Sequence, residues 1–366
     1  MKSAGKRSGF RFTCSFSRFT LTLNSPFPPV AARFVSTQLP AAFSRPLRPL
    51  AAALRLHPEK LAGIRLASRL TISAMRIATL LLLFLLPAFC NAQELPLLGL
   101  AHVGFKVTDM EKARGCYTGV LGYPEAYNLK VNLDAPTTVY LKINDEQYIL
   151  LTADLKDSEN QRVSHVAMLT SDIRKAHSML SGRGVVMEPV LTGTGGSQSF
   201  MFKDPDGNDL EMVEYRPGSS AANARGKAIG PNRISQRLRH AGVMVAKEQP
   251  ALSFYRDKLG FRETWRGGPK EGETRWINLQ MPGPSGDYIE LMLYSQPPTR
   301  QSLGSMQHIC LEVPDIEAAY RAVLARSTPD SIRQKPTVGL NRRRLLNLFD
   351  PDGSRTELME SRTVDQ

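Results

Sequence analysis

Hydrophobic and polar residues alternate at the start of four similar segments of the chain. In the first segment Val103 and Phe105 fall on one face of an expected strand, and His102 falls on the other. In the fourth segment Ile309 opposes His308 in the same way. We expect the apolar row to face a helix and the histidine row to face the other side of a sheet.

Each opening strand is followed by signals for a helix and then for further strands. Asp109 is expected to cap a helix that ends near residues 121–122, and Asp172 to cap one that ends near Gly182. Further strands are predicted at 137–144, 146–154, 274–281 and 287–294. The sequence DPDG, which occurs twice, is typical of a tight turn between strands. Each segment therefore forms one β-α-β-β-β module.

The modules repeat in register, which predicts the organisation of the whole chain. Tyr117 follows His102 by the same 15 residues that separate Tyr255 from His240. The second and fourth segments share an Asp-Ile pair and an alanine at the same offsets from His165 and His308. The chain therefore holds two copies of a two-module unit. We predict an α+β fold with four modules in two tandem domains.

Four of the six histidines and three glutamates occupy matching positions of these modules. These residues are His102, His165, Glu211, His240, Glu290, His308 and Glu357. Histidine and carboxylate side chains at fixed positions of a repeated scaffold are typical of a metal site. The sequence predicts a divalent metal ion, with zinc, nickel, cobalt, manganese and iron(II) all open.

The basic charge of the chain lies outside the modules. Residues 1–76 contain 13 Lys or Arg and one acidic residue, whereas the whole chain has a net charge of +13. The charge therefore does not indicate nucleic-acid binding. Met75 begins a positive segment, a short apolar run and a small-residue cleavage site after Ala92, which together predict a signal peptide at 75–92. Residues 1–74 are then a mispredicted extension or a targeting leader, and the mature protein is expected to be secreted or periplasmic, without a membrane span.

Composition also separates the two predicted domains. Residues 217–235 are rich in Gly, Ser, Ala and Pro and are predicted to be a linker between domains at 97–216 and 236–361. Only Cys116 and Cys310 remain in the mature part, and we predict no disulfide between them because one lies in an expected helix and the other in an expected strand.

The modules resemble the vicinal oxygen chelate superfamily, which includes glyoxalase I, extradiol dioxygenases and bleomycin-resistance proteins. The resemblance rests on DPDG followed by a strand with an apolar-Glu-apolar end, and on the histidine of the opening strand. It implies that pairs of modules form cup-shaped mixed sheets, with ligands from the first and last strands of each module. By this resemblance Leu150 stands where the first module would offer a ligand.

The consequence of Leu150 depends on how the modules pair. In sequence order, the second domain has the four-ligand set His240, Glu290, His308 and Glu357. The first then has the triad of His102, His165 and Glu211, which is similar to that of iron oxygenases. If modules exchange between domains, the second and third would share the four-ligand cup. Sequence order and the linker position favour the first arrangement.

The resemblance ranks three functions for a monomer or homodimer that binds a small molecule. The first is a metal-dependent lyase or isomerase of the glyoxalase type, in which Glu290 or Glu357 would be the catalytic base. The second is a ring-cleaving dioxygenase, which the lack of a His or Tyr shortly before Glu211 and Glu357 disfavours. The third is a non-catalytic binding protein. Arg275 and Trp276 could hold an acidic or aromatic substrate, although their positions favour ordinary strand residues over this role.

Overall fold

The structure, a computed structural model, describes residues 94–130, 132, 134–157, 159, 161–327 and 334–365. The predicted extension at 1–74 and signal peptide at 75–92 lie outside these residues. No helix within them is long and apolar enough to cross a membrane.

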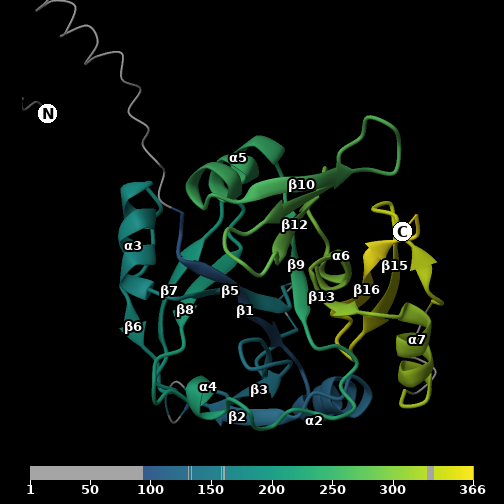
Figure 1. The fold of residues 1–366 in the computed structure, drawn as a ribbon, viewed down its shortest axis with the longest axis horizontal. Coiled ribbons are helices and arrows are strands. Elements are labelled where there is room, and N and C mark those ends of the chain that lie inside the picture. The colour runs from purple at the N-terminus through teal and green to yellow at the C-terminus, as the bar shows by residue number, and fades with distance from the viewer. Residues whose placement is uncertain are drawn as a thin grey trace, which may run out of the picture. The chain divides into compact units, whose positions relative to one another are not determined.

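The first half of the described chain, coloured blue to teal in Figure 1, forms an eight-stranded sheet. Its strand order is β2-β3-β4-β1-β5-β8-β7-β6. Its strands are β1 (Leu97–Lys106), β2 (Glu125–Leu129), β3 (Thr138–Lys142), β4 (Tyr148–Thr152), β5 (Val163–Thr170), β6 (Leu191–Thr192), β7 (Gln198–Lys203) and β8 (Asp209–Glu214). Strand β1 pairs with β4 in parallel and with β5 in antiparallel orientation, and β5 pairs with β8 in parallel.

The second half repeats this sheet in the order β10-β11-β12-β9-β13-β16-β15-β14. Its strands are β9 (Leu238–Val245), β10 (Arg262–Gly267), β11 (Trp276–Gln280), β12 (Tyr288–Leu293), β13 (His308–Val313), β14 (Thr337–Val338), β15 (Arg343–Phe349) and β16 (Arg355–Thr363). The modules therefore pair in sequence order. We call the histidine-bearing face of the first sheet the first cup, and that of the second sheet the second cup.

The helices begin where the sequence predicts. Asp109 accepts hydrogen bonds from the first turn of α2 (Met110–Arg114), and Asp172 caps α3 (Ile173–Gly182). The helix after Asp109 continues as a π-helix, η1 (Gly115–Val120), which the sequence did not predict. The second half repeats this pattern with α5 (Glu248–Leu252), η2 (Ser253–Lys258) and α7 (Ile316–Leu324), and adds α6 (Arg300–Met306).

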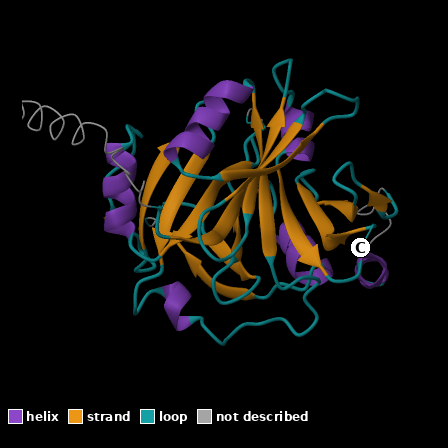
Figure 2. Ribbon diagram, turned by 45° about the horizontal axis from the view of Figure 1, so that its top comes forward, coloured by secondary structure: helices purple, strands orange, loops and turns teal. Residues whose placement is uncertain are grey.

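The apolar rows of both sheets form one continuous core. Val103 and Phe105 of β1, Val243 of β9 and Leu311 of β13 belong to the same buried cluster and are at most 2% exposed. The helices lie outside the curved strands (Figure 2). Because the apolar face of each strand is used in this core, the polar face is left for the cups.

The repeated tyrosines and DPDG turns join the two sheets. Tyr117 of η1 donates a hydrogen bond to Asp350 at 3.1 Å, and Tyr255 of η2 donates to Asp204 at 3.0 Å. Each aspartate begins a DPDG turn of the other half of the chain. Both tyrosines are buried in the core. Their hydroxyl groups form two reciprocal hydrogen bonds between the sheets, here called latches, which the sequence did not predict.

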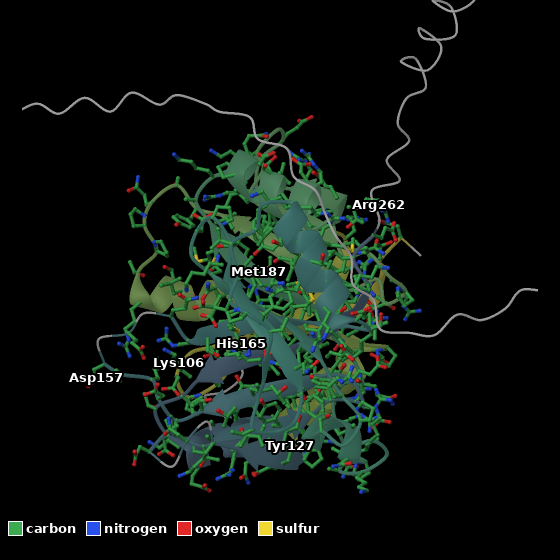
Figure 3. The ribbon with its side chains drawn as sticks, turned by 90° about the vertical axis from the view of Figure 1, so that its left-hand side faces the viewer. Lys106, Tyr127, Asp157, His165, Met187 and Arg262 are labelled. Carbon is green, nitrogen blue, oxygen red and sulfur yellow. The ribbon has the colours of Figure 1, made fainter. Side chains whose placement is uncertain are left out.

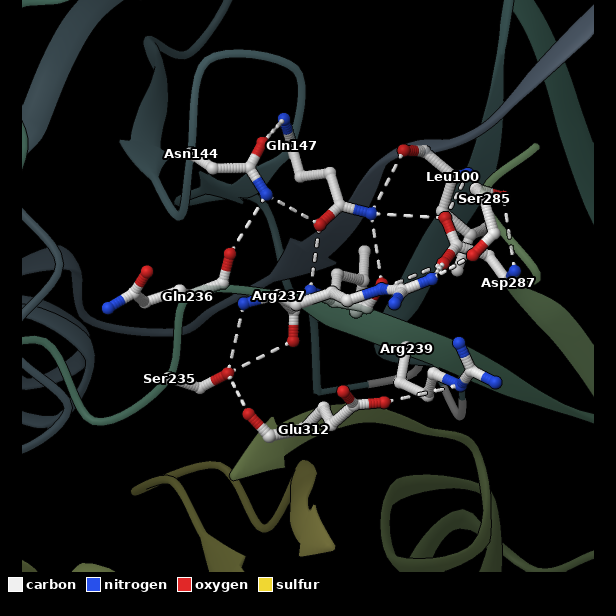
Figure 4. A network of polar contacts seen from close by, with 11 residues as sticks. Leu100, Asn144, Gln147, Ser235, Gln236, Arg237, Arg239, Ser285, Asp287 and Glu312 are labelled. Atoms are coloured by element: carbon white, nitrogen blue, oxygen red, sulfur yellow. Dashed lines mark hydrogen bonds and ion pairs between the residues drawn. The ribbon is translucent and has the colours of Figure 1, made fainter. Parts of the chain in front are cut away.

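A polar network crosses the junction of the central strands β1 and β9 (Figure 4). The side chain of Gln147 donates to the Leu238 carbonyl at 2.9 Å and accepts from the Leu238 amide at 2.9 Å. Asp287 accepts from the Leu100 amide at 3.1 Å and pairs with Arg237 at 2.7 Å. Strand edges from both sheets are thus satisfied by buried side chains, which fixes their register.

The segment predicted as a linker packs against the first sheet. Residues Ser220–Asn223 form a short helix, α4, which Ser219 caps. The fully buried ammonium group of Lys142 donates to the carbonyl oxygens of Ala224 and Lys227 and pairs with Asp145 at 2.6 Å. Carbonyl oxygens after a helix are favourable partners for a cation, so this lysine anchors the segment.

Candidate metal centres

Three side chains predicted as ligands meet in the first cup. The Nε2 atom of His102 lies 3.0 Å from Nε2 of His165 and 2.9 Å from Oε2 of Glu211, and the last two atoms are 3.5 Å apart. They come from β1, β5 and β8, the three central strands of the sheet, and His165 is seen in Figure 3. Ligands at about 90° and about 2.1 Å from an ion are separated by about 3.0 Å. The spacing therefore fits three adjacent positions around one metal ion.

The charges in this triad favour an ionised carboxylate. Burial opposes ionisation of Glu211, but the hydrogen bond from His102 and the charges of both histidines outweigh it and hold the pKa of Glu211 at about 2. Burial and the neighbouring His102 lower the pKa of His165 to about 4, so this imidazole is neutral near neutrality. A neutral imidazole and an ionised carboxylate are the forms that bind metals.

Tyrosines surround the triad in a way the sequence analysis missed. Tyr215 lies just after β8, and its hydroxyl is 3.3 Å from Nδ1 of His102, where it can fix the ring and its tautomer. Tyr127 and Tyr140 stack with ring centroids 4.4 Å apart and line the same cavity of about 190 Å³. Tyr127 and Tyr140 lie on β2 and β3, far in sequence from the segment that precedes Glu211.

Leu150 occupies the fourth position, as the repeat indicates. It pairs with Gly104 of β1 in the same register in which Glu290 pairs with Gly242 of β9. Leu150 is 3% exposed and packs with Ala221 of α4 in a small apolar cluster. The first cup therefore has an apolar wall where the second has a carboxylate.

Replacing Leu150 by Glu should make the stability of the first domain depend on metal. A carboxylate buried among these apolar groups without a cation should cost about 2–4 kcal/mol of unfolding free energy. Chemical denaturation with and without chelator measures the difference, and Leu150→Gln controls for polarity alone. Equal loss of stability in the Glu variant with and without metal would show that position 150 does not reach the ion.

The second cup brings together its four predicted residues less tightly. Nε2 of His240 and Nε2 of His308 are 3.0 Å apart, and Oε2 of Glu290 is 3.5 Å from His308. Oε1 of Glu357 is 3.9 Å from Nε2 of His240. Donor atoms of His240, Glu290 and His308 all lie within 4.8 Å of one another, and those of His240, Glu357 and Cys310 form a second such group.

Cys310 and Arg355 belong to this cup, although neither was predicted to be a site residue. Alternation along β13 places Cys310 on the same face as His308, and alternation along β16 places Arg355 on the same face as Glu357. The Arg355 guanidinium lies 2.6 Å from Nδ1 of His308. The strand period therefore carried a signal for both residues. Cys116 and Cys310, the two cysteines among the described residues, are both free.

The second cup places two carboxylates close enough to interact. Burial and the neighbouring Glu357 raise the pKa of Glu290 to about 8, and burial also raises the pKa of Glu357. Burial and the nearby arginines lower the pKa of His240 and His308 well below the usual range, so these rings are neutral. Buried carboxylates require a cation. The donor set of two imidazoles and two carboxylates therefore fits a divalent metal ion.

The two predicted substrate residues differ in position. Trp276 of β11 lines the cavity of the second cup together with Trp265 of β10. Arg275 does not line this cavity; its guanidinium pairs with Glu273 at 3.1 Å and is 41% exposed. Arg275 precedes β11 in the opposite phase from Trp276, and its role in substrate binding stays a prediction.

Comparisons with known proteins agree with this architecture. The chain is 26% identical over 227 residues to an iron-dependent extradiol dioxygenase of Rhodococcus jostii, covering 53% of this chain and 71% of that protein. The fold is similar to that of homoprotocatechuate 2,3-dioxygenase from Brevibacterium fuscum, with a TM-score of 0.56 and 20% sequence identity. The match covers 74% of this chain and 74% of that chain. The fold is also similar to that of the 2,3-dioxygenase LapB from Pseudomonas sp. KL28, with a TM-score of 0.56 and 17% sequence identity. This match covers 75% of this chain and 96% of that chain.

Both halves of the chain match one family description. The matches span residues 99–212 and 237–358, which together are more than half of the chain and include all seven predicted ligands. With two curled eight-stranded sheets and a metal-binding group in each cup, the chain belongs to the Glyoxalase/Bleomycin resistance protein/Dioxygenase superfamily.

Proposed function

We propose that this protein is an iron(II)-dependent dioxygenase of the extradiol type, acting in the first cup on an aromatic substrate with two adjacent hydroxyl groups. The observation that carries the proposal is the triad of His102, His165 and Glu211, which opens onto a cavity lined by tyrosines. Two histidines and one carboxylate with open positions are typical of non-haem iron oxygenases. The names of the similar proteins support the same reaction class.

Different residues of the first cup would have different roles in such a reaction. His102, His165 and Glu211 would hold iron(II), which would supply binding of the adjacent substrate oxygens and of dioxygen. The stacked rings of Tyr127 and Tyr140 form an aromatic wall against which a flat substrate can pack.

Tyr140 and Tyr215 can act as hydrogen-bond or proton donors beside the triad. Burial and the charge of Glu211 raise the pKa of Tyr140, and burial with neighbouring tyrosines raises the pKa of Tyr215. Both hydroxyl groups therefore keep their protons at neutral pH and can donate hydrogen bonds to an anionic oxygen of the substrate. These tyrosines answer the objection from sequence that no His or Tyr precedes Glu211.

The proposal is tested by oxygen uptake with catechol as the probe. Protein loaded anaerobically with iron(II) should consume oxygen and give a ring-opened product. His102→Ala should lower this rate by about 100-fold or more, because it removes a ligand together with its supporting hydrogen bond. His240→Ala, the matched change in the second cup, should leave the rate unchanged. The proposal is wrong if the His102 variant keeps the activity or if iron-loaded protein consumes no oxygen with any catechol.

A second activity, of the lyase or isomerase class, is supported by one observation in the second cup. Glu290 and Glu357 lie on the two strands that flank the histidine-bearing strands, and the raised pKa of Glu290 suits proton transfer near neutral pH. Exchange of a substrate C–H proton with deuterated solvent, followed by NMR, would detect this activity. Glu290→Gln should abolish the exchange, and His165→Ala should not.

A further inference from the structure

The two cups differ at matched positions of their strands. Register pairs Trp265 with Asn278 and Asn278 with Glu290, as it pairs Tyr127 with Tyr140 and Tyr140 with Leu150 in the first cup. Tryptophan thus replaces tyrosine on the first of these strands. Trp276 matches Thr138, and Arg355, two residues before Glu357, matches Asp209, two residues before Glu211. The two halves therefore share the same strand pairing but differ in the residues that line their cups.

The second cup carries arginines that the first cup lacks. Arg355 lines its cavity with both tryptophans, and Arg343 lines an adjoining cavity that shares Trp265 and Asn341 with it. Both arginines lie close enough to lower the pKa of His240. Among the described residues that line the cavity of the first cup, none is Lys or Arg.

The charge of these arginines is available to a ligand. Glu290 and Glu357 are balanced by a divalent ion when one is bound, so Arg343 and Arg355 leave the cup with surplus positive charge. Arg239, which lines the adjoining cavity with Arg343, instead pairs with Glu312 at 3.5 Å and lies over the ring of Tyr288. An anion that enters the cup therefore meets charges that protein carboxylates do not already satisfy.

Polar atoms of the cup also lack partners. Nε of Arg355 and the side-chain oxygens of Asn278 and Asn347 are buried without a hydrogen bond. Asn278 stands beside Glu290 and Asn347 beside Glu357. Such unsatisfied groups are costly unless a ligand or water pairs with them.

One side of the Arg355 guanidinium is held at the wall of the cup. Its Nη2 atom lies 2.6 Å from Nδ1 of His308 and donates to the Met306 carbonyl oxygen at 3.2 Å. The Nε atom of the same guanidinium has no partner and can donate to a ligand.

We propose that the second cup binds an organic carboxylate with a flat apolar body, which lies against Trp265 and Trp276 while its carboxylate pairs with Arg355. Arg343, in the adjoining cavity, adds positive charge. Arginine matches a carboxylate with two parallel hydrogen bonds, and tryptophan provides a broad apolar surface. The site differs from the first cup in position and in charge. Failure of the dioxygenase proposal for the first cup would leave it intact.

The chain offers a direct optical test, because Trp265 and Trp276 are its only tryptophans. Tryptophan fluorescence of the full protein loaded with Zn²⁺ is titrated with benzoate and with benzamide, its neutral analogue. Benzoate should bind at least about tenfold more tightly than benzamide. Arg355→Gln should bring the two affinities together, and Arg343→Gln should reduce the preference by about threefold to tenfold.

Arg344→Gln is the matched control for Arg343→Gln, because both arginines lie on β15. Arg344 is exposed and its guanidinium lies 3.5 Å from Glu317 of α7, away from the cup. It should keep the full preference for benzoate. The metal content of each variant is measured in parallel, and Arg343→Gln remains informative if the Arg355 variant does not fold, because Arg343 makes no contact with a predicted ligand. Equal binding of benzoate and benzamide by the native protein would overturn the proposal. A preference that survives both substitutions would place the carboxylate on the metal ion and would overturn it as well.

Discussion

Metal-free protein is expected to lose stability as the pH rises from 7 to about 8.5. Glu290 has a folded pKa of about 8, above its ordinary value of 4.5, because it is buried beside Glu357. The folded state therefore binds a proton that the unfolded state has already released, and stability falls as the pH passes through the folded value. Since one pKa unit is worth about 1.4 kcal/mol, a fall of about 1–2 kcal/mol is expected over this window. Urea denaturation at each pH measures it.

The pH range from 7 to 8.5 distinguishes the effect of Glu290 from that of the other titratable groups in the second cup. His240 and His308 have lowered folded pKa values, so their contribution is lost only as the pH falls below the unfolded value of about 6.5. Cys310 has a raised pKa and acts only near and above its ordinary value of 9. Among the titratable groups of the second cup, Glu290 is the one whose folded pKa lies between pH 7 and 8.5.

Glu290→Gln isolates the effect and gives it opposite signs with and without metal. In metal-free protein the variant should be more stable than the native chain at pH 8.5, because it removes a buried charge beside Glu357. In metal-loaded protein it should bind the ion at least about tenfold more weakly, because a charged ligand is lost. A native apo protein with the same stability at pH 7 and 8.5 would refute this account of the cup.

The strand period predicted most of the site because one face of each sheet was already committed to the core. Once Val103 and Ile309 are buried, His102 and His308 must face the cup, and the same argument extends to Arg355 and Cys310. Applied to the strand that begins at Trp276, this argument also excludes the preceding arginine from the cavity.

Two features of the structure could not be predicted from the alternation of residues along each strand: the tyrosines of the first cup and the contacts of the DPDG turns. The tyrosines of the first cup come from β2, β3 and the segment after β8, so their meeting depends on sheet curvature and not on any local pattern. The role of Asp204 and Asp350 depends on how the two sheets pack, because the turns they begin contact the other half of the chain. A turn signal in sequence describes its own loop and leaves its distant partner open.

Breaking both latches should separate the unfolding of the two halves of the protein. Asp350 accepts from the Asp352 amide at 3.0 Å, from the Ser354 amide at 2.8 Å and from Tyr117, so it holds its own turn as well as the partner helix. Asp350→Ala leaves these buried donors without an acceptor and should cost about 3–5 kcal/mol of unfolding free energy. Tyr117→Phe removes one bond and should cost about 1–2 kcal/mol.

The double variant Tyr117→Phe with Tyr255→Phe tests the coupling directly. It keeps both turns and the core packing of the rings, and removes only the two hydrogen bonds between the sheets. Calorimetry should show a lower melting temperature and a transition that broadens or splits into two, because domains that lose their interface bonds unfold more independently. Asp209→Ala, which removes an exposed pair with Lys203, should change stability by less than about 0.5 kcal/mol. A single sharp transition in the double variant, at the native temperature, would mean that the apolar core alone couples the two sheets.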